Sequence, residues 1–150
     1  MESRGLGDVY KRQTMIALED FSEEIGATNI VPGSHLWEDY TRQPEEHEVA
    51  IAEMPAGSAA IYLGATIHAG GENRTSDRWR RGVHASWICG WVRTEENTYL
   101  ACPPEIARDL PRQAQEVLGY AVHDAIQSAG GYAGALNLQD PCDLMERGEL

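Results

Sequence analysis

The sequence predicts a mainly β fold, a β-sandwich or jelly roll of short strands followed by a helical appendix. Two observations support this prediction, and the length of the chain indicates the number of domains. Short apolar or alternating segments, separated by Gly and Pro turns, fill the first two thirds of the chain. Prolines at helix entrances mark the last third. The length of 150 residues suits one domain with a modest core.

Composition and charge narrow the classes of function. Hydrophobic residues make up 42% and charged residues 24%, as in an ordinary soluble globular protein. The formal net charge of -12 argues against nucleic acids and anionic membranes as partners, because both require basic patches. The chain has no apolar run that could span a membrane, and residues at its N-terminus lack the apolar core expected of a signal peptide. We therefore expect a cytoplasmic protein whose partner is a small-molecule substrate.

The three cysteines, Cys89, Cys102 and Cys142, are widely spaced and form no C-x-x-C motif. Neither a zinc knuckle nor a disulfide framework is indicated. We expect reduced thiols.

Three segments follow one another along the chain. Residues 1–13, MESRGLGDVYKRQ, show no helical or strand period and contain the only lysine, Lys11. We expect this segment to be non-native or a disordered arm. A partial β domain is expected over residues 14–100 and a helical extension over residues 101–150.

The strands of the β domain are predicted from apolar and alternating segments bounded by turn residues. In order they fall within TMIALEDF (14–21), ATNIVPGSH (27–35), EVAIAEM (48–54), PAGSAAIYLG (55–64) and RRGVHASWICGWV (80–92). The polar stretch HLWEDYTRQPEEHE (35–48) has no period and is expected to be a surface loop.

Two helices are predicted in the last third. The first begins at the prolines of PPEIARDL (103–110), with Glu105 in its first turn. The second lies in PRQAQEVLGY (111–120), where Gly119 is a candidate C-terminal cap. The Gly/Ala-rich segment beyond Gly130 and the tail DPCDLMERGEL (140–150) are expected to be loose, peripheral chain.

The segment IYLGATIHAGGENRTSDRWRRG (61–82) carries the most informative residues. It leads His68 into a glycine turn and returns through arginines, so that strand alternation places Arg80 and His84 on one face and Arg81 on the other. Two histidines and one carboxylate hold Fe(II) in oxygenases and leave room for a 2-oxoacid. A planar arginine pairs well with the distal carboxylate of that acid. Spacing alone leaves His68 either as a metal ligand or as an ordinary strand residue.

Two segments, 17–37 and 57–87, resemble the phytanoyl-CoA dioxygenase (PhyH-like) family of Fe(II)/2-oxoglutarate-dependent oxygenases. The resemblance rests on GATNIVPGSH (26–35) and on the later H-x-x-G-x-N motif HAGGEN (68–73), which leads to an arginine. It covers most of residues 15–120. It implies a double-stranded β-helix, the jelly-roll fold of cupins, with Fe(2+) and 2-oxoglutarate as cofactor and cosubstrate.

The resemblance also implies roles for single residues. His68 is similar to the distal iron-binding histidine, and Arg80 to the arginine that binds the C5 carboxylate of 2-oxoglutarate, with Arg81 as the register alternative. Further candidates for the turn and the pocket are Gly70, Asn73, His84 and His35.

The family's His-x-Asp or His-x-Glu pair, which supplies the other two iron ligands, does not occur in these 150 residues. We therefore expect a fragment with little or no oxygenase activity of its own. Its intact parent is expected to hydroxylate a small metabolite and to form succinate and CO2.

Two alternatives remain open from the sequence. The first is a non-catalytic jelly-roll protein that binds a small carboxylate or a protein partner. The second is a cupin-type metal enzyme whose ligands are His68, His84 and a carboxylate such as Glu53. A missing strand would also expose sheet edges, so self-association of the fragment is expected.

Overall fold

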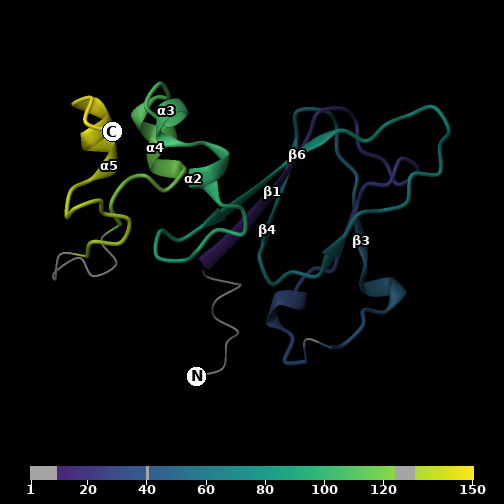
Figure 1. The fold of residues 1–150 in the computed structure, drawn as a ribbon. Helices are drawn as coiled ribbons and strands as arrows, with labels where there is room; N and C mark the ends of the chain where they lie inside the picture. Colours follow the sequence, from purple (N-terminus) through teal and green to yellow (C-terminus); the bar gives the residue numbers. More distant parts are fainter. Residues whose placement is uncertain (1–9, 40, 124–130) are drawn as a thin grey trace. The chain divides into compact units, whose positions relative to one another are not determined.

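The computed structural model describes residues 10–39, 41–123 and 131–150. The chain divides into two compact units, residues 1–87 and residues 88–150. Strands dominate the first unit, and short helices dominate the second (Figure 1).

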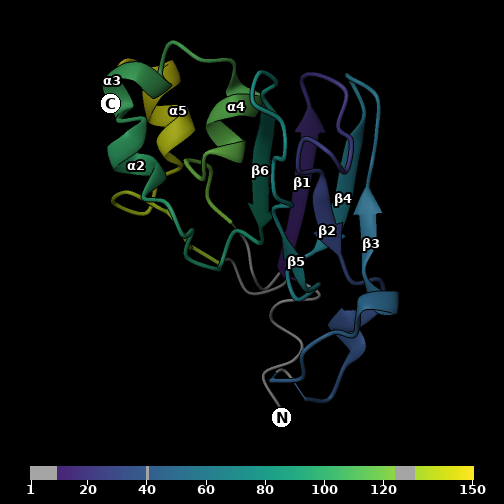
Figure 2. The same cartoon turned by 90° about the vertical axis from the view of Figure 1, so that its right-hand side faces the viewer.

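The first sheet has the strand order β4-β1-β6 (Figure 2). Its strands are β1 (Lys11–Ala17), β4 (Ala59–Leu63) and β6 (Gly82–Ile88). β1 therefore begins three residues before the predicted start of the β domain at Thr14, while residues 1–9 of the expected arm lie outside the described residues. Alternation along β1 buries Gln13 and Ala17 on one face of the sheet.

The second sheet has the order β3-β2-β5, with both pairings antiparallel. Its strands are β3 (Ala50–Ala52), β2 (Thr28–Ile30) and β5 (His68–Ala69). Ile30 lies directly opposite His68 in this sheet. The mainly β fold class predicted from the sequence is confirmed, and the two sheets form a partial double-stranded β-helix.

The core of the first unit lies where β1 leads into the GATNIVPGSH segment. Ala17, Phe21 and Ala27 are buried there, with Met15 and Met54 packed against them. The backbone groups of Phe21 and Met54 also exchange two hydrogen bonds, of 2.8 and 3.0 Å.

Two glycines bring the sequence motifs against each other. Gly26 has a φ of +84°, and a Cβ at this position would lie 2.6 Å from the carbonyl oxygen of Gly71. A Cβ on Gly71 would lie 2.5 Å from the carbonyl oxygen of Ala27. The crossing of GATNIVPGSH and HAGGEN therefore requires glycine at both positions.

The loop predicted over residues 35–48 contains two short 3-10 helices. They are η1 (Ser34–Leu36) and η2 (Glu46–Glu48). Glu45 and Glu48 form a capping box at η2. The side chain of each residue accepts a hydrogen bond from the backbone N–H of the other.

The second unit contains four short helices. They are α2 (Thr98–Ala101), α3 (Pro104–Ala107), α4 (Arg112–Val117) and α5 (Pro141–Glu146). Gly119 follows α4 with a φ of +91°, the conformation expected of a C-terminal cap. No helix within the described ranges is long and apolar enough to cross a membrane.

The prediction that the tail is loose chain is wrong for residues 141–146. Asp140 caps α5 by accepting a hydrogen bond of 2.8 Å from the backbone N–H of Cys142, and Pro141 occupies the first helical turn. Cys142 and Met145 are buried against Ala107 and Tyr120. At six residues, the helix is too short for its apolar residues to show a clear period.

Candidate functional site

His68 lies on β5, which forms an edge of the second sheet as far as the described strands extend. Its Nδ1 is 2.8 Å from the carbonyl oxygen of Thr66. A carbonyl can only accept a hydrogen bond, so Nδ1 carries the proton and Nε2 keeps a free lone pair. Ligating histidines in metal sites are commonly oriented in this way.

The PGSH segment holds the backbone that precedes His68. The buried hydroxyl of Ser34 accepts a hydrogen bond of 2.8 Å from the N–H of Ile67, and the N–H of Val31 donates to the carbonyl of Ile67 at 2.9 Å. His35 itself is half-buried within η1. It is therefore Ser34, rather than His35, that links this segment to the strand of His68.

Arg80 precedes β6 and is half-buried. Its Nη1 donates to Oγ1 of Thr28 at 3.3 Å, and its guanidinium carbon lies 5.2 Å from the centre of the Phe21 ring. A Cβ on Gly70 would be 3.5 Å from its Nη2, so the guanidinium also lies near the end of β5.

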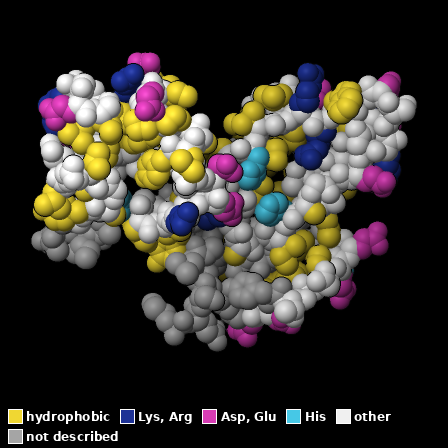
Figure 3. All heavy atoms as spheres, in the orientation of Figure 1, with side chains coloured by type: hydrophobic (Ala, Val, Ile, Leu, Met, Phe, Trp, Pro, Cys, Tyr) yellow, Lys and Arg dark blue, Asp and Glu magenta, His cyan; other side chains and the backbone are white. Residues whose placement is uncertain are grey.

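Arg80 differs from the arginines around it in its charge balance. Arg74, Arg78 and Arg81 each form an ion pair with a glutamate. Those glutamates are Glu23, Glu24 and Glu19, and neighbouring acidic and basic side chains are visible on the face drawn in Figure 3. Within the part of the chain that the structure describes, no carboxylate pairs with Arg80. Its positive charge is available to an anionic ligand.

Arg81 contacts Glu19 rather than Thr28 and Phe21, the neighbours of Arg80. Its Nε and Nη2 donate to the carboxylate of Glu19 at 3.2 and 3.3 Å. These hydrogen bonds lower the pKa of Glu19 and raise the pKa of Arg81, so the pair is charged at neutral pH. The geometry therefore favours Arg80 over Arg81 as the arginine of the site.

His68 and Arg80 face the same side of the second sheet. Thr28, the partner of Arg80, and Ile30, opposite His68, are two residues apart on β2 and so share a face. Two residues of strand span about 7 Å. This separation suits a short dicarboxylic acid that contacts Arg80 at one end and a group near His68 at the other.

Gln13 and His84 lie on the first sheet and add polar groups to the site. The side-chain nitrogen of Gln13 is 3.3 Å from Nε2 of His84. Gln13 also lies opposite Tyr62 in the β1–β4 pairing, and the Tyr62 ring is 4.6 Å from that of His68. The Gln13 oxygen is buried and has no hydrogen-bond partner.

Asn73 organises the turn after His68. Its amide nitrogen donates to the carbonyl of Arg78 at 2.8 Å, and its oxygen accepts from the backbone and hydroxyl of Thr75. Its hydrogen bonds within the turn account for its place in the motif.

The described residues do not form a complete metal site. No group of three or more His, Cys, Asp or Glu side chains in residues 10–39, 41–123 and 131–150 could hold a metal ion. Glu53, a ligand in the cupin-type alternative, instead accepts a hydrogen bond from the N–H of Glu23 at 2.8 Å. The orientation of His68 fits one iron ligand, and the other residues do not complete the set.

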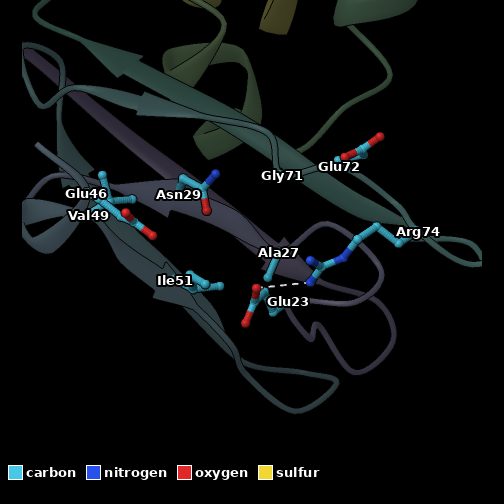
Figure 4. Close-up of a pocket in the computed structure, with 9 residues that line it drawn as sticks. All are labelled: Glu23, Ala27, Asn29, Glu46, Val49, Ile51, Gly71, Glu72 and Arg74. Atoms are coloured by element: carbon cyan, nitrogen blue, oxygen red, sulfur yellow. Dashed lines mark hydrogen bonds and ion pairs between the residues drawn. The ribbon is translucent and has the colours of Figure 1, made fainter. Parts of the chain in front are cut away.

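A separate hollow of about 420 Å³ lies beside the second sheet (Figure 4). Asn29 and Ile51 line it and lie opposite each other in the β2–β3 pairing. Asn29 alternates with Thr28 along β2, so this hollow opens on the face away from Arg80.

The profile of the phytanoyl-CoA dioxygenase (PhyH) family matches residues 11–82, which include both motifs, His68 and Arg80. This stretch of the chain is similar to that family. The resemblance read from GATNIVPGSH and HAGGEN is therefore confirmed.

Several fungal dioxygenases are similar to this chain. The dioxygenase swnH1 of Metarhizium robertsii is 36% identical over 129 residues, which cover 86% of this chain and 40% of that protein. The dioxygenase aneA of Aspergillus aculeatus is 38% identical over 104 residues, covering 68% and 35%. The chain thus spans about two fifths of the length of the curated relatives it matches.

A solved structure is also similar in part. The non-heme alpha-ketoglutarate-dependent epimerase SnoN from nogalamycin biosynthesis matches with a TM-score of 0.44 and 28% identity, over 51% of this chain and 32% of SnoN.

Gln13, Thr28 and Tyr62 join the candidate site only in the folded structure. Gln13 was assigned to the expected arm, although the alternation of TMIALEDF can be extended back to it. Thr28 stands within GATNIVPGSH, but only the fold shows its hydroxyl beside Arg80.

Proposed function

We propose that this chain is part of an Fe(II)/2-oxoglutarate-dependent oxygenase and carries the arginine that binds the cosubstrate. The intact protein hydroxylates a small metabolite, with succinate and CO2 as coproducts. The match of residues 11–82 to the PhyH family and the dioxygenase names of the similar proteins support an oxygenase.

The observation that carries the proposal is the charge of Arg80. This half-buried guanidinium lies beside a hydroxyl donor, Thr28, and no described carboxylate pairs with it. A half-buried cation without a counter-charge is unfavourable, and a ligand carboxylate reduces that cost. A planar guanidinium and a neighbouring hydroxyl can together donate to both oxygens of such a carboxylate.

Gln13 supports the same ligand at the other end of the site. A buried amide oxygen without a partner is unfavourable, because it has lost its hydrogen bonds to water. The amide lies on the Tyr62 side, near His68, whereas Arg80 lies on the Thr28 side. A 2-oxoacid held by Arg80 would bring its second carboxylate toward this amide.

The intact protein would hold iron with His68 and with ligands from outside the described residues. His68 would supply one ligand through Nε2, and the described residues do not complete the site. β5 and β6 each end a sheet in the described part of the chain. Strands of a longer protein therefore have edges on which to pair and could bring further ligands. No hydroxylation step is assigned to the residues of this chain.

The proposal is tested by measuring the affinity for 2-oxoglutarate with isothermal titration calorimetry. Arg80→Gln removes the charge and keeps much of the side-chain length. We expect it to weaken binding by roughly tenfold or more, the loss typical of a hydrogen bond to a charged group.

Arg81→Gln is the matched control, because Arg81 is paired with Glu19 instead. It should leave the affinity unchanged. Equal affinities for the Arg80→Gln variant and the unmodified protein would overturn the proposal.

A second candidate function is a non-catalytic protein that binds small carboxylates through the same arginine. The unpaired charge of Arg80 supports it as well, because binding a carboxylate through this side chain requires no metal. The two functions differ in their response to Fe(II). If a metal site forms, Fe(II) tightens 2-oxoglutarate binding, because each ligand then favours the other; a binding protein shows no such coupling.

A further inference from the structure

His84 on β6 contacts only one side-chain partner that the structure records, the amide of Gln13 on β1. The two residues are 71 positions apart in sequence, and Nε2 of His84 lies 3.3 Å from the amide nitrogen of Gln13. Gln13 is 6% exposed, whereas His84 is exposed. His84 is thus the residue that can control which way the buried amide points.

A glutamine amide can adopt two orientations that exchange its oxygen and nitrogen. In the first, the NH2 group of Gln13 donates to Nε2 of His84 and the buried oxygen has no partner. In the second, Nε2–H of His84 donates to the oxygen, and the NH2 group turns toward the position that the oxygen held. The tautomer of His84 decides between them, because Nε2 accepts in the first and donates in the second.

A carboxylate at this end of the site requires the second orientation, because it can only accept hydrogen bonds. An amide oxygen facing a carboxylate would be repulsive, whereas an NH2 group donates to it with a charge-assisted bond. The neighbouring Tyr62 ring, opposite Gln13 and 4.6 Å from the His68 ring, places this end of the site beside His68.

We propose that His84 is a positioning residue for the acid: it donates from Nε2 to the Gln13 oxygen and so directs the Gln13 NH2 group at the ligand. This inference rests on the proposed function, because the ligand is the 2-oxoacid held by Arg80. It adds a role for His84, which need not touch the ligand or the metal.

The test is the affinity for 2-oxoglutarate across a set of variants. His84→Leu removes the donor and should weaken binding by roughly fivefold, the size of one net hydrogen bond between neutral groups. His84→Gln restores an N–H near the place of Nε2 and should return the affinity to within about twofold of the unmodified protein. His47→Leu, in the exposed turn η2, is the matched histidine control and should have no effect.

A double-mutant cycle separates positioning from a general loss of structure. In a Gln13→Leu background, His84→Leu should cause no further loss of affinity, because there is no amide left to orient. The ¹⁵N chemical shifts of His84 in the 2-oxoglutarate complex should report the Nε2–H tautomer. If His84 were only structural, His84→Leu would weaken binding by the same factor with and without the Gln13→Leu substitution.

The outcomes distinguish this inference from the proposed function. If the unmodified protein binds 2-oxoglutarate, Arg80→Gln weakens binding as expected and His84→Leu has no effect, the role of His84 is wrong and the proposed function stands. A loss that His84→Gln does not rescue, or an Nδ1–H tautomer in the complex, also overturns it. If the unmodified protein does not bind 2-oxoglutarate, both proposals fail together.

Discussion

Nη1 of Arg80 lies 3.3 Å from Oγ1 of Thr28, although the two residues are 52 positions apart in sequence. Thr28 belongs to the GATNIVPGSH motif, and Arg80 follows the HAGGEN motif. Their contact brings the two motifs together on one face of the second sheet. It also explains the place of a small hydroxyl residue within the first motif.

The crossing of the two motifs should be intolerant of any side chain at Gly26. Gly26→Ala forces an alanine into the left-handed region and against the Gly71 carbonyl. We expect a loss of about 2–4 kcal/mol in the free energy of unfolding, from backbone strain and overpacking together. Urea unfolding measured by circular dichroism checks this value.

Gly33→Ala is the control for Gly26→Ala. Gly33 has a similar φ of +81°, but a Cβ there would meet no atom within 4 Å. It should cost only the strain of the left-handed conformation, about 1 kcal/mol. If Gly26→Ala and Gly33→Ala lower the free energy of unfolding equally, the close approach of the two motifs at Gly26 is contradicted.

Ser34 should stabilise the strand that carries His68. Ser34→Ala leaves the N–H of Ile67 without its acceptor in a part-buried place. We expect a loss of about 1–3 kcal/mol in the free energy of unfolding. Ser86→Ala, at an exposed position of β6, should change stability by less than about 0.5 kcal/mol. If the two serine variants are equally stable, the hydroxyl of Ser34 has no structural role.

In the second unit, Arg112 links α4 to α5. Its guanidinium contacts Asp143 and Glu146 of α5 at 2.8 and 3.0 Å, besides Glu116 of its own helix. The hydrogen bond to Asp143, followed by those to Glu146 and Glu116, raises the pKa of Arg112.

The side chain of Arg112 is 36% exposed, and solvent therefore screens these pairs. We expect Arg112→Ala to lower the free energy of unfolding by about 1 kcal/mol, and by less at high salt. The exposed Arg108 provides the control, since Arg108→Ala should have little effect at either salt concentration. A loss for Arg112→Ala that does not depend on salt would rule out the ion pairs as its cause.

The stability of the second unit should fall at alkaline pH because of Cys142. Burial, with a smaller contribution from Asp140, raises the pKa of its thiol from 9.0 to about 11. The folded protein therefore holds this proton more tightly than the unfolded chain does. The stabilisation is complete below pH 9.0 and is lost as the pH rises toward about 11.

Thermal melts followed across this pH range, for the unmodified protein and for Cys142→Ala, isolate the contribution of the thiol. The variant should be less stable at neutral pH, because it leaves a small cavity, and its melting temperature should decline less steeply with pH. Parallel declines in the two proteins would contradict the raised pKa.

The positions of several strands along the sequence could be predicted from local patterns. EVAIAEM and PAGSAAIYLG each contain one strand of the structure, as their alternation and turn residues indicated. Alternation also predicted that Arg80 and Arg81 point to opposite sides. In the structure they bind different partners: Arg80 donates to Thr28, and Arg81 donates to Glu19.

What could not be predicted depends on contacts between distant segments. The contact of Gln13 with His84 requires the register of β1 against β6, which no local pattern encodes. Helix α5 was missed for a related reason, since its burial depends on Ala107 and Tyr120 from earlier in the chain.

A crystal structure of this protein with 2-oxoglutarate tests the central claim most directly. The account predicts one carboxylate of the acid within hydrogen-bond distance of Arg80 and Thr28, and the other end directed toward His68 and Gln13. Density for the acid against Arg81, or in the hollow beside Asn29 and Ile51, would contradict it.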